Sequence, residues 1–360
     1  MSFDEMIRRH VRGWMVGQGP DSDVVLGTRV RLARNLKDIP FPGVATQEQL
    51  HEVVKRVRPA IESLDARWGG PLKFTRMGDV PDLTRQLLVE RHLISPAHTQ
   101  QVREKAFAVR DDEAASIMVN EEDHLRIQAL FAGFQLEEAL NLADRVDDGL
   151  SERLEYAFSE RVGYLTAWPT NVGTGLRASV MLHLPALAMA GQLQHVLSAV
   201  ARFGVAVRGL YGEGTESVGN IFQISNQVSL GRSEDEILKH LANLAHEVVG
   251  HERTARQRLM SDRRALEDRI WRSYGVLRYS RAISSQEAMQ RLSDVRLGID
   301  LGIIEGLDQR ILTELLVVIR PAHLQSFMGR ELTPAERDVH RAALIRERIR
   351  LPNERLAQGP

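Results

Sequence analysis

The alternation of apolar and polar residues predicts a strand, a polar turn and a second strand across residues 114–131. The first apolar run covers residues 114–119, and the second alternates Leu125, Ile127, Ala129 and Phe131 with Arg126, Gln128 and Leu130. Between the two runs stand three adjacent carboxylates, Glu121, Glu122 and Asp123. Adjacent like charges repel one another, so a fold keeps them together only where a cation binds or solvent screens them. The turn is therefore either a cation site or a solvated acidic turn.

Period-two patterning predicts further strands at residues 23–35, 163–168, 205–211 and 220–230. In the first of these, Val30 and Leu32 fall on one face, while Arg29 and Arg31 fall on the other. Two arginines side by side on a strand face meet either solvent or an anion. The sequence leaves both possibilities open at this point.

Helical spacing predicts helices at residues 47–64, 83–93 and 135–158, and a further helix that begins near Ala178. The turn before Ala178, residues 169–177, is rich in threonine, asparagine and glycine. A turn of this kind that opens a helix offers unpaired N–H groups to a phosphate, although glycine turns usually serve chain reversal. His92, near the end of its helix, is more often a capping or packing residue than a ligand.

The last third of the chain is predominantly helical. Ser233 and Glu236 form a capping box for a long helix, in which His246 and His251 are five residues apart and so do not match the four-residue spacing of zinc-binding helices. Two more capping boxes are predicted at Ser284 with Glu287 and at Thr333 with Glu336. We therefore predict two domains, a catalytic one at residues 1–258 and a helical one at residues 259–360.

Composition narrows the class of protein. A chain of 360 residues with 43% hydrophobic and 26% charged content is typical of a globular protein. Its net charge of −1 gives no global field for nucleic acid or a membrane, so a polyanion needs locally clustered arginines. The absence of cysteine excludes disulfides, thiolate metal sites and a thiol nucleophile. No signal peptide or apolar run of about 18 residues stands out, which predicts a cytoplasmic protein.

Five arginines lie at or near predicted strand or loop ends, while acidic residues lie in two loops around Glu122 and Glu213. These arginines are Arg29, Arg31, Arg126, Arg177 and Arg208. Several guanidinium groups together can neutralise a triphosphate with Mg²⁺, and the carboxylates can hold a guanidinium of their own. The residues thus favour phosphoryl transfer to a guanidinium.

Four segments resemble the motifs of the phosphagen kinases, the family of creatine and arginine kinases. They are residues 27–35, 120–126, 169–177 and 208–213, and they occur in the family's order. The resemblance covers about residues 20–255. It implies an α+β fold, an antiparallel sheet flanked by helices like that of glutamine synthetase, with ATP and Mg²⁺ as cofactors and a guanidino substrate. It implies no resident metal site.

Site residues follow from this resemblance position by position. Glu122 corresponds to the carboxylate that orients and deprotonates the guanidinium, with Glu213 as its partner and Glu121 and Asp123 beside it. The five arginines and their motif neighbours correspond to the nucleotide site, with His92 near the base or ribose. The neighbours are Gly27, Thr28, Val30, Ala178, Ser179, Val180, Met181, Gly209, Leu210, Tyr211 and Gly212.

Two departures refine the resemblance. Only 26 residues precede Gly27, where small-molecule phosphagen kinases have a helical domain that closes over the free amino acid, so we expect an open site. This arrangement resembles the bacterial protein arginine kinases of the McsB type. Those enzymes phosphorylate arginines in proteins, including a stress-gene repressor, and mark proteins for a Clp protease. Their resemblance also implies a zinc-finger activator, a Clp ATPase partner and a homodimer, without direct nucleic-acid or membrane binding.

The second departure is Trp168, which occupies the family's cysteine position and could crowd the guanidinium pocket.

The motif at residues 337–342 resembles the phosphoarginine-sensing segment of those kinases. Arg337 and Arg341 are four residues apart on one helix face, with Asp338 beside them. Two arginines and one aspartate could hold the phosphate and the guanidinium of phosphoarginine together, whereas a solvated charged face is the plainer interpretation. The sequence predicts an allosteric phosphoarginine site here.

A guanidinium is a poor nucleophile, since its pKa lies far above that of a carboxylic acid and it stays protonated. Glu122 would therefore accept the proton only as the N–P bond forms, and alignment and charge neutralisation would supply most of the rate. Two alternatives stay open. One is a catalytically weakened adaptor that binds phosphoarginine, and the other is a kinase for free arginine.

Overall fold

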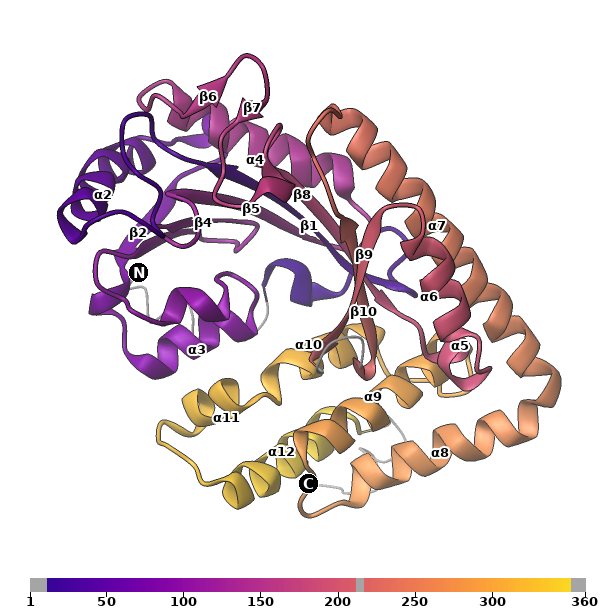
Figure 1. Cartoon of the computed structure of the whole chain (residues 1–360). Helices are drawn as coiled ribbons and strands as arrows, with labels where there is room; N and C mark the ends of the chain where they lie inside the picture. The colour runs from indigo at the N-terminus through magenta and orange to yellow at the C-terminus, as the bar shows by residue number, and fades with distance from the viewer. Residues whose placement is uncertain (1–11, 212–216, 351–360) are drawn as a thin grey trace.

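The computed structural model describes residues 12–211 and 217–350, and an antiparallel sheet of eight strands organises them. The strands follow the order β2-β3-β4-β5-β1-β8-β10-β9 (Figure 1). Their bounds are β1 Val25–Arg34, β2 Leu72–Arg76, β3 Ala106–Arg110, β4 Ala115–Val119, β5 Leu125–Ala132, β8 Leu176–His183, β9 Val205–Tyr211 and β10 Ser217–Asn226. A separate hairpin joins β6 Phe158–Ser159 to β7 Gly163–Tyr164.

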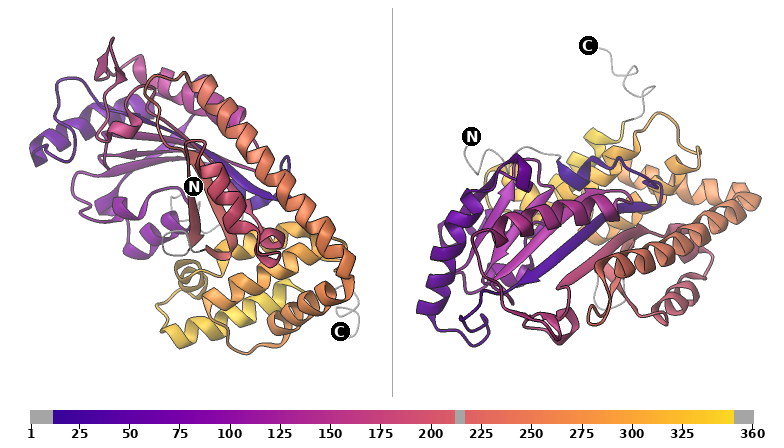
Figure 2. Two further views of the ribbon diagram at one scale, coloured as in Figure 1. Left: turned by 45° about the vertical axis from the view of Figure 1, so that its right-hand side comes forward. Right: turned by 90° about the horizontal axis from the view of Figure 1, so that it is seen from above.

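One face of the sheet is covered by helices. Strand positions such as Val30, Leu32 and Val180 are fully buried there, because period-two alternation points them all to the same side. The helices that pack on this face are α2 Gln47–Glu62, α4 Leu136–Ser151, α6 Leu193–Ala201 and α7 Glu234–Leu259. Figure 2 shows α7 running along the sheet toward the C-terminal helices. This layer is the main hydrophobic core.

The opposite face packs against helices only in part. At one end lies a second core that combines Leu26, Met181 and Ile221 of the sheet with residues of the C-terminal helices. Those helices are α8 Arg263–Tyr279, α9 Ser285–Asp300, α10 Gln309–Val318, α11 Pro321–Met328 and α12 Pro334–Arg348. The helical region therefore shares apolar packing with the sheet, and the predicted division at residue 258 stays a prediction.

The remaining helices are short or lie at the edges of the sheet. Helix α3 Asp82–Glu90 contributes to a third core with β3 and β4, and it contacts α11. Helix α5 Pro185–Met189 packs on α7. The 3₁₀ helices are η1 Gly13–Val16, η2 Ala66–Trp68, η3 Met77–Asp79, η4 Pro96–Thr99, η5 Pro169–Asn171 and η6 Met260–Asp262.

The helix predicted to begin near Ala178 is wrong, because residues 176–183 form strand β8 between β1 and β10. Ala178, Val180 and Leu182 alternate with polar or longer residues, which is a strand pattern once two neighbours supply hydrogen bonds. The turn at residues 169–175 consequently opens no helix. Any phosphate binding here depends on the side chains of the strand instead of a helix N-terminus.

Other boundaries differ by less. The predicted helix at 135–158 ends at Ser151, and the predicted strand at 163–168 is regular only over Gly163–Tyr164. The strand predicted at 220–230 is β10, which begins and ends earlier. The capping boxes of α7 and α12 are confirmed, whereas Ser284 caps α9 without the reciprocal bond from Glu287. Within residues 12–211 and 217–350, no helix has the length and apolar character needed to span a membrane.

Candidate active site

Strand alternation gathers the predicted arginines on the face of the sheet that lacks the main helical layer. Arg29 and Arg31 stand on β1, Arg126 on β5, Arg177 on β8 and Arg208 on β9. Arg31 and Arg177 are directly opposite one another in the antiparallel register. Like charges in that position destabilise a sheet. We call these five residues the arginine face.

The electrostatics of the arginine face favour an anion. Burial, followed by repulsion from Arg29, Arg126 and Arg177, lowers the pKa of Arg31 well below its usual value. Burial and repulsion from Arg208 and Arg126 also lower the pKa of Arg177. The Nε–H of Arg31 is buried and has no hydrogen-bond acceptor among the described residues. A buried donor without an acceptor is costly, and a phosphate oxygen would satisfy it.

Two polar residues of β10 orient the arginine face. Gln223 accepts a hydrogen bond from Nη2 of Arg29 at 2.8 Å, and Ser225 accepts one from Nη2 of Arg177 at 3.3 Å. Gln223 also pairs with Arg208 across the β9–β10 register. Both acceptors are neutral, so they position guanidinium groups without cancelling their charge. The face therefore keeps its positive potential for a ligand.

Arg126 joins the arginine face to the acidic turn between β4 and β5. Its Nη1 lies 2.5 Å from Oε2 of Glu121, and its Nη2 lies 2.7 Å from Oε2 of Glu122. The Glu121 side chain is 3% exposed and also accepts a hydrogen bond from the Ser95 hydroxyl. The Glu122 side chain is 40% exposed. Of the two carboxylates, only Glu122 is open enough to meet an incoming substrate.

Asp123 holds the turn in place from within. Its Oδ1 accepts hydrogen bonds from Nδ2 of Asn35 and from the backbone N–H of Ala167, both at 2.7 Å. Burial raises the pKa of Asp123, while these two hydrogen bonds lower it. Asn35 in turn accepts a bond from the N–H of His124. Asp123 thus ties the acidic turn to the strand end at Asn35 and to the loop before Trp168, and its catalytic assignment stays a prediction.

His92 lies at the other end of the arginine face, where Arg29 is nearby. Burial, with smaller contributions from Arg29 and Arg320, lowers the pKa of His92 to about 3, so the imidazole is neutral at physiological pH. Its ring stands edge-on to Trp14, with centroids 5.3 Å apart. A Cβ at Gly27 would lie 2.9 Å from the backbone oxygen of Phe131 and 2.9 Å from Cε of Met181, so glycine is required at this position of β1. A neutral imidazole backed by the buried Trp14 suits the edge of a nucleobase.

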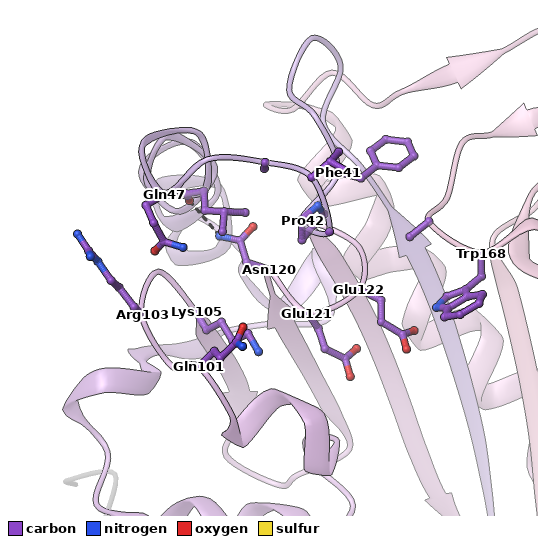
Figure 3. A pocket seen from close by; sticks show the side chains of 15 residues that line it. Phe41, Pro42, Gln47, Gln101, Arg103, Lys105, Asn120, Glu121, Glu122 and Trp168 are labelled. Atoms are coloured by element: carbon purple, nitrogen blue, oxygen red, sulfur yellow. Dashed lines mark hydrogen bonds between the residues drawn. The ribbon is translucent and has the colours of Figure 1, made fainter.

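A cavity of about 860 Å³ opens beside Glu122. Figure 3 shows Trp168 on one wall, next to Glu122, and Arg103 and Gln101 on the opposite side. Trp168 is 55% exposed, and its backbone oxygen accepts a bond from the Thr166 hydroxyl. The indole therefore forms a wall of the cavity without filling the main core.

Some predicted nucleotide-site residues face away from the arginine face. Thr28 bonds the backbone oxygen of Gly133, and Val30, Ala178 and Val180 are buried in the main core. The motifs were predicted as continuous blocks, whereas a strand presents only every second residue to a ligand. Ser179 lies on the arginine face and bonds the backbone oxygen of Arg29. These residues align the strands that carry the arginines.

The remaining predicted residues lie at the edge of the site. Gly209, Leu210 and Tyr211 continue β9 beyond Arg208, and Leu210 packs on the second core. Gly212 and Glu213 lie outside the described residues. The predicted partnership of Glu213 with Glu122 therefore stays a prediction.

The predicted phosphoarginine motif lies on α12, away from the acidic turn. Arg341 is 2% exposed, and its Nε and Nη1 donate to the backbone oxygens of Ile319 and Ile283 at 2.9 and 2.8 Å. Its Nη1 also lies 2.5 Å from Oδ1 of Asp338. Arg337 donates to the backbone oxygen of Leu332. The motif thus already serves the packing of the C-terminal helices.

Sequence reasoning missed four residues that shape the site, namely Trp14, Asn35, Ser95 and Gln223. Asn35 closes the first predicted motif, so its position was visible, but its bond to Asp123 spans 88 residues. Ser95 and Gln223 carry no local pattern that sets them apart. Their roles arise from strand register and from the packing of α3, which a single sequence does not reveal.

Comparison with known proteins places this site in a family. Residues 52–255 match the ATP:guanido phosphotransferase C-terminal catalytic domain, and residues 263–358 match the protein-arginine kinase McsB C-terminal domain. A protein-arginine kinase of Pelotomaculum thermopropionicum is 51% identical over 348 residues, covering 96% of this chain and 98% of that relative. The chain belongs to the protein-arginine kinase family. The family member of Moorella thermoacetica is 55% identical over 336 residues, covering 93% of this chain and 96% of its own.

Solved structures agree with the fold of this family. The substrate-free duplicated taurocyamine kinase from Schistosoma mansoni matches with a TM-score of 0.55 and 27% identity. The match covers 64% of this chain and 33% of that duplicated chain. The α+β fold predicted from the sequence, an antiparallel sheet flanked by helices with a helical C-terminal region, is therefore confirmed.

Proposed function

We propose that this protein transfers a phosphoryl group from ATP to arginine side chains of proteins. The single observation that carries the proposal is the position of Arg126, whose guanidinium belongs to the arginine face and also holds Glu122 at the cavity. A phosphate on the arginine face and a guanidinium on Glu122 would therefore be neighbours. Proximity of donor and acceptor is the main requirement of phosphoryl transfer.

The side chains fit a nucleotide with its Mg²⁺. The mutual repulsion within the arginine face and the buried Nε–H of Arg31 both call for phosphate oxygens. Arg29, Arg31, Arg126, Arg177 and Arg208 would hold the phosphates, and His92 with Trp14 would border the base. Bound Mg²⁺ would neutralise part of the phosphate charge.

Glu122 supplies the chemistry on the acceptor side. Its exposed carboxylate would accept hydrogen bonds from two nitrogens of the substrate guanidinium, and one of these two, the attacking nitrogen, would be aimed at the phosphorus. The new N–P bond forms while the bond from phosphorus to the leaving diphosphate oxygen breaks. The proton of the attacking nitrogen passes to Glu122, and Arg126 stabilises the carboxylate until that transfer.

The open cavity favours arginine within a protein over the free amino acid. Trp168 is 55% exposed and Val44 is 81% exposed, and both line the cavity beside Glu122. A cavity with exposed walls admits a polypeptide on either side of the target arginine. Free arginine, which needs enclosure to exclude water, would leave most of this surface uncovered.

The test is the formation of acid-labile phosphoarginine on an arginine-rich protein, measured by mass spectrometry with ATP and Mg²⁺. We expect Glu122→Gln to reduce the rate at least about 10²-fold while ATP affinity stays near wild type. Glu138→Gln, on the exposed side of α4, is the matched control and should retain activity. Wild-type turnover in Glu122→Gln would contradict the proposal. Phosphorylation of free arginine but of no protein would show that the substrate is the free amino acid.

The proposal extends to the biological setting that the resemblance implies. It includes phosphorylation of a stress-gene repressor, marking of proteins for Clp degradation, a zinc-finger activator, a homodimer and a cytoplasmic location. The family assignment and the C-terminal domain match support this setting. Pull-down of a Clp ATPase with phosphorylated but not with unphosphorylated substrate would test the degradation step.

A second part of the proposal is that phosphoarginine binds the motif on α12. Asp338 and Arg337 are half-buried and reachable, whereas Arg341 already donates to two backbone oxygens. Asp338→Ala should therefore abolish binding in calorimetry with little loss of fold stability, while Arg341→Ala should lower both. Unchanged phosphoarginine affinity in both variants would leave this motif with its packing role alone.

A further inference from the structure

The cavity beside Glu122 extends well beyond the space that one guanidinium needs. Its volume is about 860 Å³, and its far wall is built by residues 41–45, the start of α2 and residues 101–105. Figure 3 shows Lys105 between Glu121 and Gln101, and Arg103 farther out beside Gln47. A chain leaving the catalytic end in this direction would pass Lys105 and then Arg103.

Two cations at this end have donors to spare. Lys105 donates to the backbone oxygens of Ala97 at 3.2 Å and Gln100 at 2.8 Å, which leaves one of its three N–H groups. Arg103 is exposed and forms no hydrogen bond or ion pair with any residue that the structure describes. The carboxylates in the same cavity both pair with Arg126, and Glu121 also acts on Lys105, while Glu122 stays open to a substrate guanidinium.

The loop that carries these cations is held in a defined conformation. Asn120 donates from Nδ2 to the backbone oxygens of Leu50 at 2.9 Å and Glu104 at 2.7 Å, which joins the acidic turn to α2 and to the loop. Gln101, Glu104 and Asn120 all have positive φ, at 47°, 54° and 60°. Such conformations cost energy in non-glycine residues and cluster where a surface is shaped for a ligand.

We propose that Lys105 and Arg103 form a subsite that binds a carboxylate side chain of the protein substrate, an aspartate or glutamate near the target arginine. The inference rests on the proposed function and names the substrate feature that the same site selects. Phe41, Pro42 and Val44 supply the apolar wall between the two ends of the cavity. An acidic residue beside the target arginine would thus meet cations, while its arginine meets Glu122.

Nearby acids set the strength of this subsite. Glu48 interacts with Arg103 across the start of α2, and Glu104 is paired with His51 at 3.0 Å. These charges reduce the local positive potential without reaching Lys105. The preference should therefore be modest and should weaken with added salt, as expected for partly exposed pairs.

The test compares two peptides that each contain one arginine, with either glutamate or glutamine at the flanking positions. We expect wild-type enzyme to show about a five-fold higher kcat/KM for the glutamate peptide, the size of one partly screened ion pair. The double variant Arg103→Gln/Lys105→Met should lose this ratio, and Arg103→Glu should reverse it in favour of a lysine-flanked peptide. Arg145→Gln, on the outer side of α4, is the matched control and should keep the ratio.

The outcomes separate the subsite from the proposed function. Phosphorylation of both peptides with equal kcat/KM in wild type would overturn the subsite alone, while failure to phosphorylate any peptide would overturn both. Free arginine, assayed in parallel, carries its own carboxylate. If the double variant raised its KM while leaving the peptide ratio intact, the subsite would bind the amino acid's carboxylate and the assignment to a protein side chain would be wrong.

Discussion

The buried and partly buried arginines of this protein fall into two groups that differ in what surrounds the guanidinium. In the first group each buried guanidinium is paired with a carboxylate, and its members are Arg34, Arg91, Arg256, Arg296 and Arg341. Arg34, for example, pairs with Asp147 at 2.6 Å, donates to the oxygens of Ala33 and Thr174, and stacks on Tyr164. Arg31, on the arginine face, is partly buried with its Nε–H enclosed, and it stands among other cations.

This difference separates arginines that stabilise the folded chain from arginines that are available to bind a ligand. Desolvation lowers the pKa of Arg34, but Asp147 and the nearby tyrosines together raise it above its usual value, whereas burial and repulsion lower that of Arg31. A saturated guanidinium stabilises the folded chain, while one surrounded by like charges is tolerated only where function requires it. Sequence neighbours on one strand, three residues apart, thus have opposite roles.

The largest expected effect is the loss of stability when one partner of a buried arginine–carboxylate pair is removed. Arg34→Met leaves Asp147 buried without its partner, so we expect a loss of about 3–5 kcal/mol in the free energy of unfolding. Urea denaturation measures this loss. The double variant Arg34→Met/Asp147→Leu should recover much of it, and equal losses in both variants would show that the pair is not the cause.

Removing a cation from the arginine face should act on activity instead. Arg31→Met relieves repulsion from Arg29, Arg126 and Arg177, so stability should stay equal or rise. The rate of arginine phosphorylation should fall about 10²–10³-fold, since a preorganised donor to the transferring phosphate is lost. A variant that unfolds as readily as Arg34→Met would erase the distinction between the two groups.

The prediction from sequence succeeded where the pattern was local. The strand–turn–strand around Glu122 and the cap at Ser233 both depend on nearby residues, and the structure confirms them. Residues 176–183 were predicted as a helix because the preceding glycine turn resembles a helix start. Pairing with β1 and β10 decides that segment, and such pairing reaches partners as distant along the chain as Val25, which pairs with Leu182.

Strand alternation places Arg34 on the core face with Val30 and Leu32, but the sequence does not show which partner it meets there. That partner, Asp147, comes from α4, 113 residues away. The bonds from Glu90 to the backbone of Ala322 and His323 span more than 230 residues and join α3 to α11. Contacts of this kind depend on tertiary packing, which carries no local signal.

Two buried histidines, His98 and His124, are neutral in the folded protein. Burial lowers the pKa of His98 and of His124 to about 4, and Nδ1 of His124 accepts the Leu36 N–H at 3.0 Å. Their stabilisation is present above the unfolded pKa of about 6.5 and is lost as pH falls toward 4. Asp144, whose pKa burial raises to about 7, opposes this trend.

We therefore expect the free energy of unfolding to fall by about 1–3 kcal/mol between pH 6.5 and pH 4 through these histidines. In His124→Gln the fall should be smaller, because the unfolded variant no longer gains that proton. Denaturation at a series of pH values measures both slopes. Identical slopes in wild type and variant would remove His124 from the pH dependence.

The smallest expected effect on turnover is that of replacing Trp168. This residue lies beside Glu122 in the cavity. Trp168→Cys should raise turnover by about two- to five-fold, worth less than 1.4 kcal/mol, by opening the guanidinium pocket. Stability should change by no more than about 0.5 kcal/mol because the indole is exposed. Trp168→Ala separates the gain of space from the gain of a thiol, and unchanged turnover in both would remove support from the adaptor alternative.

The most direct test of the arginine face is the shift in thermal unfolding midpoint that ATP produces in wild type and in Arg31→Met. A ligand that binds only the folded state raises the midpoint, and the rise grows with the logarithm of the ligand concentration over Kd. We predict a clear ATP-dependent rise in wild type and, in Arg31→Met, loss of most of that rise together with a ligand-free midpoint at or above that of wild type. A lower ligand-free midpoint with an undiminished ATP shift would contradict the assignment of these arginines to the nucleotide.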